Sequence, residues 1–320
     1  MLDPKVAERI TRALNFQETD CVPICDFIDN SRLFEYFSHK ENHSLEEKVK
    51  AYHGLGVDVC WRFNQRLSHR ENGIWANLRR FAMRAPRFRV ITRDELFAEF
   101  DDFAQQQELF QPYTYLAMST EGCLSVLYRG IGFEEFTRRM YEYPIETERL
   151  IDIFAENLYQ KADEFARRDL GGIFFIKDDI AYDKGLIFSL DFLQKQWLPR
   201  IKQAIRPLKD KNVKVILHSE GDIGPLIDGL ISIGIDGIHP VDSTAGMDAS
   251  IIKKKYGRSL ILFGSIELNV LPDEEVIAHT NRYIRNAACG AGCFLGTRFG
   301  ITNDLDLKRV FSFFNAIKEH

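Results

Sequence analysis

Short apolar runs alternate with amphipathic stretches along most of the chain. Eight runs predict strands, because they are rich in β-branched and aromatic residues and end in polar residues or Gly. These runs are residues 21–27, 56–64, 113–119, 172–177, 213–218, 235–239, 260–264 and 292–296. The stretches around them predict helices, including 6–14, 45–53, 133–141 and 146–168. Gly234 and Gly257 stand where a helix end needs a left-handed residue before the next strand.

Eight strands with intervening helices predict an α/β protein, a (β/α)8 TIM barrel formed by residues 1–320 as a single domain. An open doubly wound sheet is the alternative, and it is weaker because no Gly-x-Gly-x-x-Gly follows an early strand. The segment 65–111 is longer than an ordinary connection. We interpret it as an excursion between the second and third strands, near the active-site mouth, with a β-like stretch at 87–92.

Composition narrows the class of partner. The chain is 45% hydrophobic, with a net charge of −5, whereas a nucleic-acid binder has a clustered basic footprint. Lys253 to Lys255 is the only all-lysine run, and we interpret it as the solvated end of a helix. No apolar signal region or membrane span is found, which predicts a cytoplasmic protein. The six cysteines form no Cys-x-x-Cys pair and predict core thiols, with Cys25 and Cys293 placed to face a site.

The polar residues that directly follow the strands are the candidates for chemistry. In a barrel these strand ends meet at one mouth. The expected group is Asp26, Asn64, Ser119, Thr120, Glu121, Asp178, Asp179, His218, Glu220, His239, Asp242, Glu267 and Arg298. Adjacent Asp178 and Asp179 cannot both point inward from one extended segment. One faces the cavity and the other caps the following turn, and the residues alone leave open which is which.

The segment Lys214 to Asp222 carries the strongest local signal. Period-2 alternation places His218 on the face of Ile216, and Glu220 joins that face if the chain stays extended. His218 and Glu220 have ligand types that zinc accepts, and barrel geometry makes Glu267 a candidate third ligand. The alternative is a hydrogen-bonded pair in which Glu220 fixes the His218 tautomer. His239 has the same two interpretations, with a structural role favoured.

A family resemblance follows from these residues. His218-Ser-Glu-Gly-Asp-Ile and Gly234-Ile-Asp-Gly-Ile-His-Pro, with Asp178-Asp179 and Phe263-Gly-Ser-Ile-Glu267, resemble the uroporphyrinogen decarboxylase superfamily. That superfamily joins the heme-pathway decarboxylase to corrinoid-dependent methyltransferases on one (β/α)8 barrel. The resemblance covers nearly the whole chain and is weakest in 65–111.

Two differences from the motifs of this superfamily bear on which of its two branches the chain resembles. The decarboxylase carries an arginine-rich segment after the first strand that clamps the substrate's carboxylates, whereas residues 28–32 here include a single arginine, Arg32. The thiol-directed methyltransferases carry His-x-Cys after the fifth strand and another Cys after the eighth. Here His218 matches, Glu220 replaces the first Cys, and residues 297–300 contain none. The resemblance therefore implies a relative that acts on an oxygen or nitrogen methyl group.

The resemblance implies a methyltransferase that moves a methyl group between a small O- or N-methylated substrate and the cobalt of a corrinoid. No Asp-x-His-x-x-Gly pattern occurs, so a partner protein is expected to carry this cobalamin. The predicted site residues are catalytic His218, Asp178, Asp179 and Glu220, cofactor-binding Asn64, Trp75 and Arg79, and zinc ligands His218, Glu220 and Glu267. The alternatives are a cofactor-independent decarboxylase that uses Asp178 or Asp179 with His218 on an acidic or tetrapyrrole-like substrate, and a barrel that binds a tetrapyrrole or corrinoid without turnover.

Overall fold

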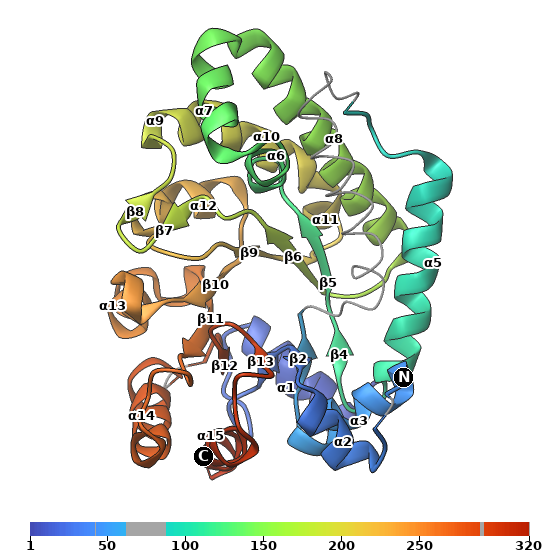
Figure 1. Ribbon diagram of the computed structural model, residues 1–320, viewed down its shortest axis with the longest axis vertical. Coiled ribbons are helices and arrows are strands. Elements are labelled where there is room, and N and C mark those ends of the chain that lie inside the picture. The colour runs from blue at the N-terminus through green and yellow to red at the C-terminus, as the bar shows by residue number, and fades with distance from the viewer. Residues whose placement is uncertain (42, 62–87, 289–290, 320) are drawn as a thin grey trace. The chain divides into compact units, whose positions relative to one another are not determined.

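The computed structural model describes residues 1–41, 43–61, 88–288 and 291–319 (Figure 1). The chain forms two compact units. The first unit comprises Met1–Phe63, Phe103–Met118 and Asp236–His320, and the second comprises Asn64–Asp102 and Ser119–Ile235.

The first unit contains a run of parallel strands. β1 (Cys25–Asp26), β3 (Val59–Cys60) and β4 (Tyr115–Leu116) pair in that order. β10 (Gly237–Val241), β11 (Ile261–Ile266) and β12 (Cys293–Thr297) also pair in order. A parallel bridge between Ile24 and Leu295 joins β1 to β12. β13 (Ile301–Thr302) pairs with β2 (Ile28–Asp29). The early strands are shorter than predicted, and Pro23 contributes because it has no N–H to donate to a ladder.

The helices of the first unit agree closely with the amphipathic pattern. They are α1 (Pro4–Leu14), α2 (Ser31–Ser38), α3 (Leu45–Leu55), α13 (Ala249–Tyr256), α14 (Val276–Tyr283) and α15 (Leu307–Lys318). Single turns stand at η3 (Ser243–Ala245), η4 (Gly257–Ser259), η5 (Asp273–Glu275) and η6 (Ile284–Ala288). The three lysines end α13 as predicted. Lys253 is nevertheless not simply solvated, because its ammonium donates to Ala291 O and lies 5.1 Å from the Phe16 ring centroid.

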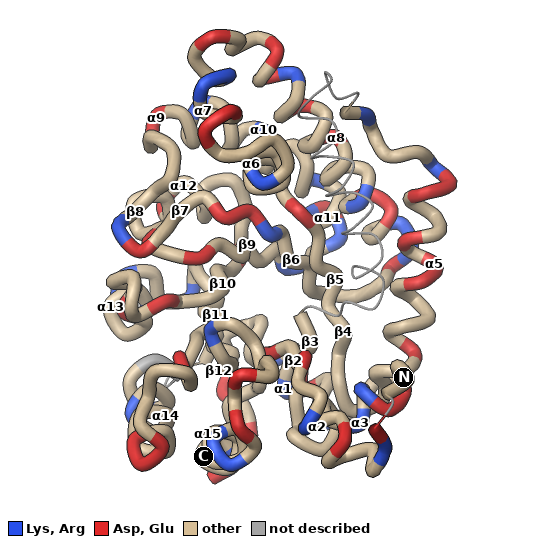
Figure 2. Tube along the Cα trace, in the orientation of Figure 1, with Lys and Arg blue, Asp and Glu red and all other residues tan. Residues whose placement is uncertain are grey.

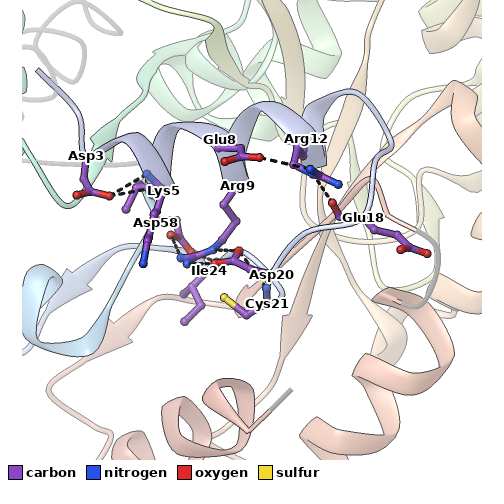
Figure 3. Close-up of polar contacts among 11 residues, drawn as sticks. Asp3, Lys5, Glu8, Arg9, Arg12, Glu18, Asp20, Cys21, Ile24 and Asp58 are labelled. Carbon is purple, nitrogen blue, oxygen red and sulfur yellow. Dashed lines mark hydrogen bonds and ion pairs between the residues drawn. The ribbon is translucent and has the colours of Figure 1, made fainter.

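Arg9 ties α1 to the segments that lead into β1 and β3 (Figure 3). Its guanidinium donates to Asp20 at 2.7 and 2.8 Å and to Asp58 Oδ1 at 2.6 Å. The other Asp58 oxygen accepts the Ile24 N–H at 2.8 Å. Burial raises the pKa of Asp58 above its usual value, against the opposing effect of Ile24 and Arg9. The positive charge of Arg9 therefore stabilises the ionised form of the buried Asp58 carboxylate.

Replacing Arg9 by Met is expected to lower the free energy of unfolding by about 2–3 kcal/mol, since it leaves a buried carboxylate without its cation. The expected loss is below that of a fully buried pair because Arg9 itself is partly exposed. Urea unfolding of the variant beside Arg12→Met, a change at an exposed arginine of the same helix, measures the difference. Equal stability of the two variants would contradict the structural role of the Arg9–Asp58 pair.

The second unit is built on β6 (Ile173–Lys177) and β9 (Lys214–His218), which pair in parallel with Lys177 opposite His218. β5 (Met118–Glu121), which crosses the division of the chain, is the neighbour of β6 on the side away from β9. β7 (Ala181–Tyr182) and β8 (Gly185–Leu186) form a small antiparallel hairpin after β6. β6 and β9 begin and end within one residue of the predicted runs.

Helices lie between and after the strands of the second unit. They are α6 (Ser125–Ile131), α7 (Phe133–Glu142), α8 (Pro144–Arg168), α9 (Leu190–Phe192), η1 (Leu193–Trp197), α10 (Leu198–Ala204), α11 (Arg206–Asp210), η2 (Gly224–Leu226) and α12 (Ile227–Ile233). α8 packs against α7, α10 and α11 (Figure 1). Its buried Phe165 meets Phe174 of β6 with ring centroids 5.2 Å apart. Gly234 ends α12 with φ +99°, as predicted.

The described part of the predicted excursion is largely helical. α5 (Arg93–Phe110) occupies most of it and crosses the division between the units. The β-like interpretation of 87–92 is wrong for residues 88–92, which form no strand. Instead, the Ile91 N–H donates to Asn157 Oδ1 at 2.6 Å, and Phe88 packs on Phe154 at 5.5 Å. Both partners belong to α8, so a helix takes the place of a neighbouring strand.

Charge and hydropathy agree with the composition. Figure 2 shows acidic and basic positions interspersed along the described chain, in keeping with the small net charge of −5. None of the described helices combines the length and the apolar character that crossing a bilayer requires.

Candidate active site

The carboxyl ends of β5, β6 and β9 bring charged residues together in the second unit. Glu121, Lys177 and His218 are the last residues of these strands. Asp179 follows two residues after Lys177, and Arg129 lies on α6. We call these five residues the charged cluster. Carboxyl ends of parallel strands are where α/β folds place their chemistry.

Asp178 is the structural member of the aspartate pair. It is fully buried. Its carboxylate accepts the backbone N–H groups of Cys123, Leu124 and Ser125 and the Trp197 Nε1–H, at 2.5–3.2 Å. Burial raises the pKa of Asp178 above its usual value, against the effect of these donors. Asp178 therefore fixes the start of α6, which carries Arg129.

Asp179 is the aspartate that joins the charged cluster. Its carboxylate forms an ion pair with Arg129, and its Oδ1 lies 3.9 Å from His218 Nε2. The same oxygen accepts the Glu220 N–H at 3.1 Å, while Asp179 O accepts the Tyr128 hydroxyl at 2.7 Å. These contacts hold the carboxylate beside the imidazole. The two aspartates lie in different surroundings, as the alternation argument required, but Asp178 caps the distant start of α6 and not the turn that follows it.

Glu121 and Lys177 extend the cluster. The Lys177 ammonium lies 2.8 Å from Glu121 Oε1, and Arg129 Nη1 lies 3.8 Å from Glu121 Oε2. Partial burial raises the pKa of Glu121, but Lys177 and Arg129 outweigh it, so that the pKa lies below its usual value. Lys177 and Arg129 are site residues that the sequence analysis missed. Lys177 had a signal, since a lysine ends an otherwise apolar strand, but Arg129 lies mid-helix and had none.

Glu220 lies at a turn beyond β9. The strand ends at His218, and the chain then turns at Gly221, where φ is +83°. A Cβ at Gly221 would lie 2.4 Å from the Tyr182 backbone. Only glycine allows both this φ and this close approach. Glu220 is thereby held next to Asp179 through its backbone N–H.

The first unit has its own set of polar strand ends. Arg298 follows β12 and donates to Thr244 Oγ1 at 2.6 Å and to Glu267 Oε2 at 3.2 Å. It also pairs with Asp242 Oδ2 at 2.6 Å. Asp242 caps η3 by accepting the Thr244 N–H. Asp242, Glu267 and Arg298, all predicted from strand position, are thus brought together within this unit.

Asp26, the last residue of β1, links the end of β1 to the end of β12 in the first unit. Its carboxylate accepts the Thr297 N–H and hydroxyl at 2.9 and 3.0 Å and the Phe27 N–H at 2.8 Å. Thr297 ends β12, so the contact joins the ends of β1 and β12. Burial raises the pKa of Asp26 from 3.8 to about 7, against the effect of these three donors.

The Asp26 pKa predicts a pH effect on stability. The unfolded chain releases this proton near pH 3.8 and the folded chain near pH 7, so folding is favoured by proton binding between these values. The contribution is complete below about pH 4 and is lost as the pH rises through about 7. Urea unfolding across this range is expected to show wild type losing stability relative to Asp26→Asn, which has no carboxyl proton to release. A constant difference between the two proteins would contradict the raised pKa.

His239 is structural, as favoured from the sequence. It is buried, with its ring centroid 4.5 Å from Trp61 and 6.2 Å from Phe263. Burial lowers the pKa of His239 to about 3, so the imidazole is neutral near pH 7. Cys25 and Cys293 are buried thiols. Burial raises the pKa of Cys293 to about 12, which is typical of core thiols.

The zinc site stays a prediction. His218 and Glu220 belong to the second unit, whereas Glu267 pairs with Arg298 in the first. Within the described residues, no group of three or more His, Cys, Asp or Glu side chains is arranged to hold a metal ion. The donors seen here do not make up a zinc ligand set, so no step proposed below runs through zinc. Asn64, Trp75 and Arg79 lie outside the described residues.

The site and the strand pattern define a parallel α/β protein with a charged cluster at its strand ends. A family model described as uroporphyrinogen decarboxylase (URO-D) matches residues 109–320, and the chain belongs to this family. By structure, the chain is similar to a methyltransferase from Methanosarcina mazei, with a TM-score of 0.74 and 16% identity over 98% of each chain. This likeness confirms the predicted (β/α)8 fold. No curated protein matches the chain.

Proposed function

We propose that this protein transfers a methyl group from a small O- or N-methylated substrate to the cobalt of a corrinoid that a partner protein carries. The observation that carries the proposal is the His218–Asp179 pair, with His218 Nε2 3.9 Å from Asp179 Oδ1. Family membership and a structural neighbour titled a methyltransferase support it.

The His218–Asp179 pair can supply the proton that the leaving oxygen or nitrogen needs in methyl transfer. When the methyl group moves to Co(I), the metal supplies both electrons of the new bond, and the donor's oxygen or nitrogen keeps the electrons of the broken one. Protonated His218 gives this leaving atom its proton, as a general acid. Asp179 stabilises the charged imidazolium, and Arg129 forms an ion pair with Asp179. The products are the demethylated substrate and the methylated corrinoid.

Three arginines of the described residues argue against a polyanion clamp. Arg129 is paired with Asp179, and Arg298 with Asp242 and Glu267. Arg32 donates to the carbonyls of Asn303 and Leu305. Each guanidinium is thus held by groups of the protein itself. This favours methyl transfer over decarboxylation of a substrate with several carboxylates.

The test mixes the protein with cob(I)alamin or a corrinoid carrier protein and a panel of methoxylated and methylamine donors. Methylcobalamin is followed by absorbance, and the expected result is donor-dependent methylation. The control is the same mixture with His218→Ala protein. If no donor is demethylated while a carboxylated substrate releases carbon dioxide, the decarboxylase alternative replaces the proposal.

A further inference from the structure

A cavity of about 360 Å³ lies in the second unit. Its walls come from α7, the start of α8 and the segment 187–196, and none of its lining residues belongs to the charged cluster. This volume falls within the usual range for small-molecule pockets, roughly 300–1,000 Å³.

Aromatic rings form much of the cavity wall. Phe133, Tyr141, Phe188 and Phe192 all line it. Phe188 is the centre of this group, with its ring centroid 5.5 Å from Phe192 and 6.4 Å from Phe133. The face of an aromatic ring carries partial negative charge, so a wall of several rings attracts a cation.

Among the described residues that line the cavity, Glu148 is the only charged one. Among the described residues, its side chain accepts one hydrogen bond, from Gln196 Nε2 at 3.2 Å, and has no ion-pair partner. The nearby Arg200 is engaged elsewhere, since it donates to Asp152 at 2.6 Å and to Gln196 at 2.7 Å. The carboxylate therefore retains acceptor capacity for an occupant.

The cavity also lies next to the segment that carries Asp179. Tyr128, whose hydroxyl donates to Asp179 O, packs on two rings of the cavity wall. Its centroid is 5.8 Å from Phe133 and 6.3 Å from Phe188. A molecule in the cavity would thus touch the rings that hold Tyr128 in place.

We propose that this cavity binds a small organic cation, an ammonium group with an apolar or aromatic body. The rings and the apolar lining receive the body, and Glu148 faces the positive charge. A carboxylate here disfavours anions, and a neutral apolar molecule would leave Glu148 desolvated without a partner. The inference stands on the cavity alone and does not require methyl transfer to be the reaction.

The experiment measures binding by calorimetry with three probes that share a benzyl body. Benzyltrimethylammonium is the cation, benzyl alcohol the neutral molecule and phenylacetate the anion. The cation is expected to bind most tightly. Glu148→Gln should weaken its binding by about tenfold, because it removes the carboxylate that faces the positive charge while leaving the rings in place.

Glu146→Gln is the matched control, since Glu146 is an exposed glutamate of the same helix and does not line the cavity. It should leave the affinity for the cation unchanged. Thermal unfolding of both variants confirms that they are folded. The proposal is overturned if the cation fails to bind, if benzyl alcohol binds equally well, or if Glu148→Gln and Glu146→Gln have equal effects. If the cation binds but no donor is demethylated in the methylcobalamin assay, this inference stands and the proposed function is refuted.

Discussion

Replacing His218 by Ala is expected to reduce methyl transfer by at least about 100-fold, the usual scale for loss of a general acid. The imidazole stands at the end of β9 beside Asp179, and histidine is the side-chain type whose ordinary pKa lies nearest to pH 7. The free energy of unfolding should change by less than about 1 kcal/mol, because strand-end residues contribute to the site more than to the packed layers. Methylcobalamin absorbance measures the first quantity and urea unfolding the second.

Ile216→Ala is the matched control, because Ile216 precedes His218 by two residues on the same strand and is fully buried. It should destabilise the protein by about 2–5 kcal/mol, as large-to-small core changes do. Methyl transfer by the folded fraction should remain much closer to wild type than that of His218→Ala. If the His218 variant unfolds as readily as the Ile216 variant, His218 is structural and the proposed acid is misplaced.

The sequence predicts the late strands well because their apolar runs are continuous and end in Gly or charge. The predicted run 213–218 and β9 (Lys214–His218) differ by one residue. The early strands are less clear, since β1 and β3 have two ladder residues each and Ile24 beside β1 adds only an isolated bridge to Leu295. Strand ends could be listed from the sequence, but their contacts could not, because partners such as Glu267 and Arg298 are far apart in the chain.

The aspartate pair shows what the local sequence pattern cannot determine. Alternation requires that Asp178 and Asp179 point to opposite sides, but it does not say which side holds the site. The answer depends on the start of α6, more than fifty residues earlier, where three N–H groups need an acceptor. Gly122 is part of this fit, since a Cβ there would lie 2.3 Å from Asp178 Oδ2. Arg129, placed on the same helix, became a site residue only through that packing.

Exchanging each aspartate for asparagine is expected to separate the two roles. Asp178→Asn keeps the shape but puts an NH2 group where an oxygen accepts at least two of the four donors. One or two buried N–H groups then lose their acceptor and the buried NH2 group itself faces donors, at about 1–3 kcal/mol for each unsatisfied group. The expected loss of unfolding free energy is about 4 kcal/mol, measured by urea unfolding. Methyl transfer falls only through loss of folded protein and through displacement of α6.

Asp179→Asn should give the opposite pattern. Its partner Arg129 is 39% exposed, and ion pairs with exposed partners contribute about 1 kcal/mol or less to stability. The catalytic loss should be about tenfold or more, because the imidazolium of His218 loses its counter-charge. If Asp178→Asn is inactive yet fully stable, while Asp179→Asn unfolds, the assignment of the two carboxylates must be reversed.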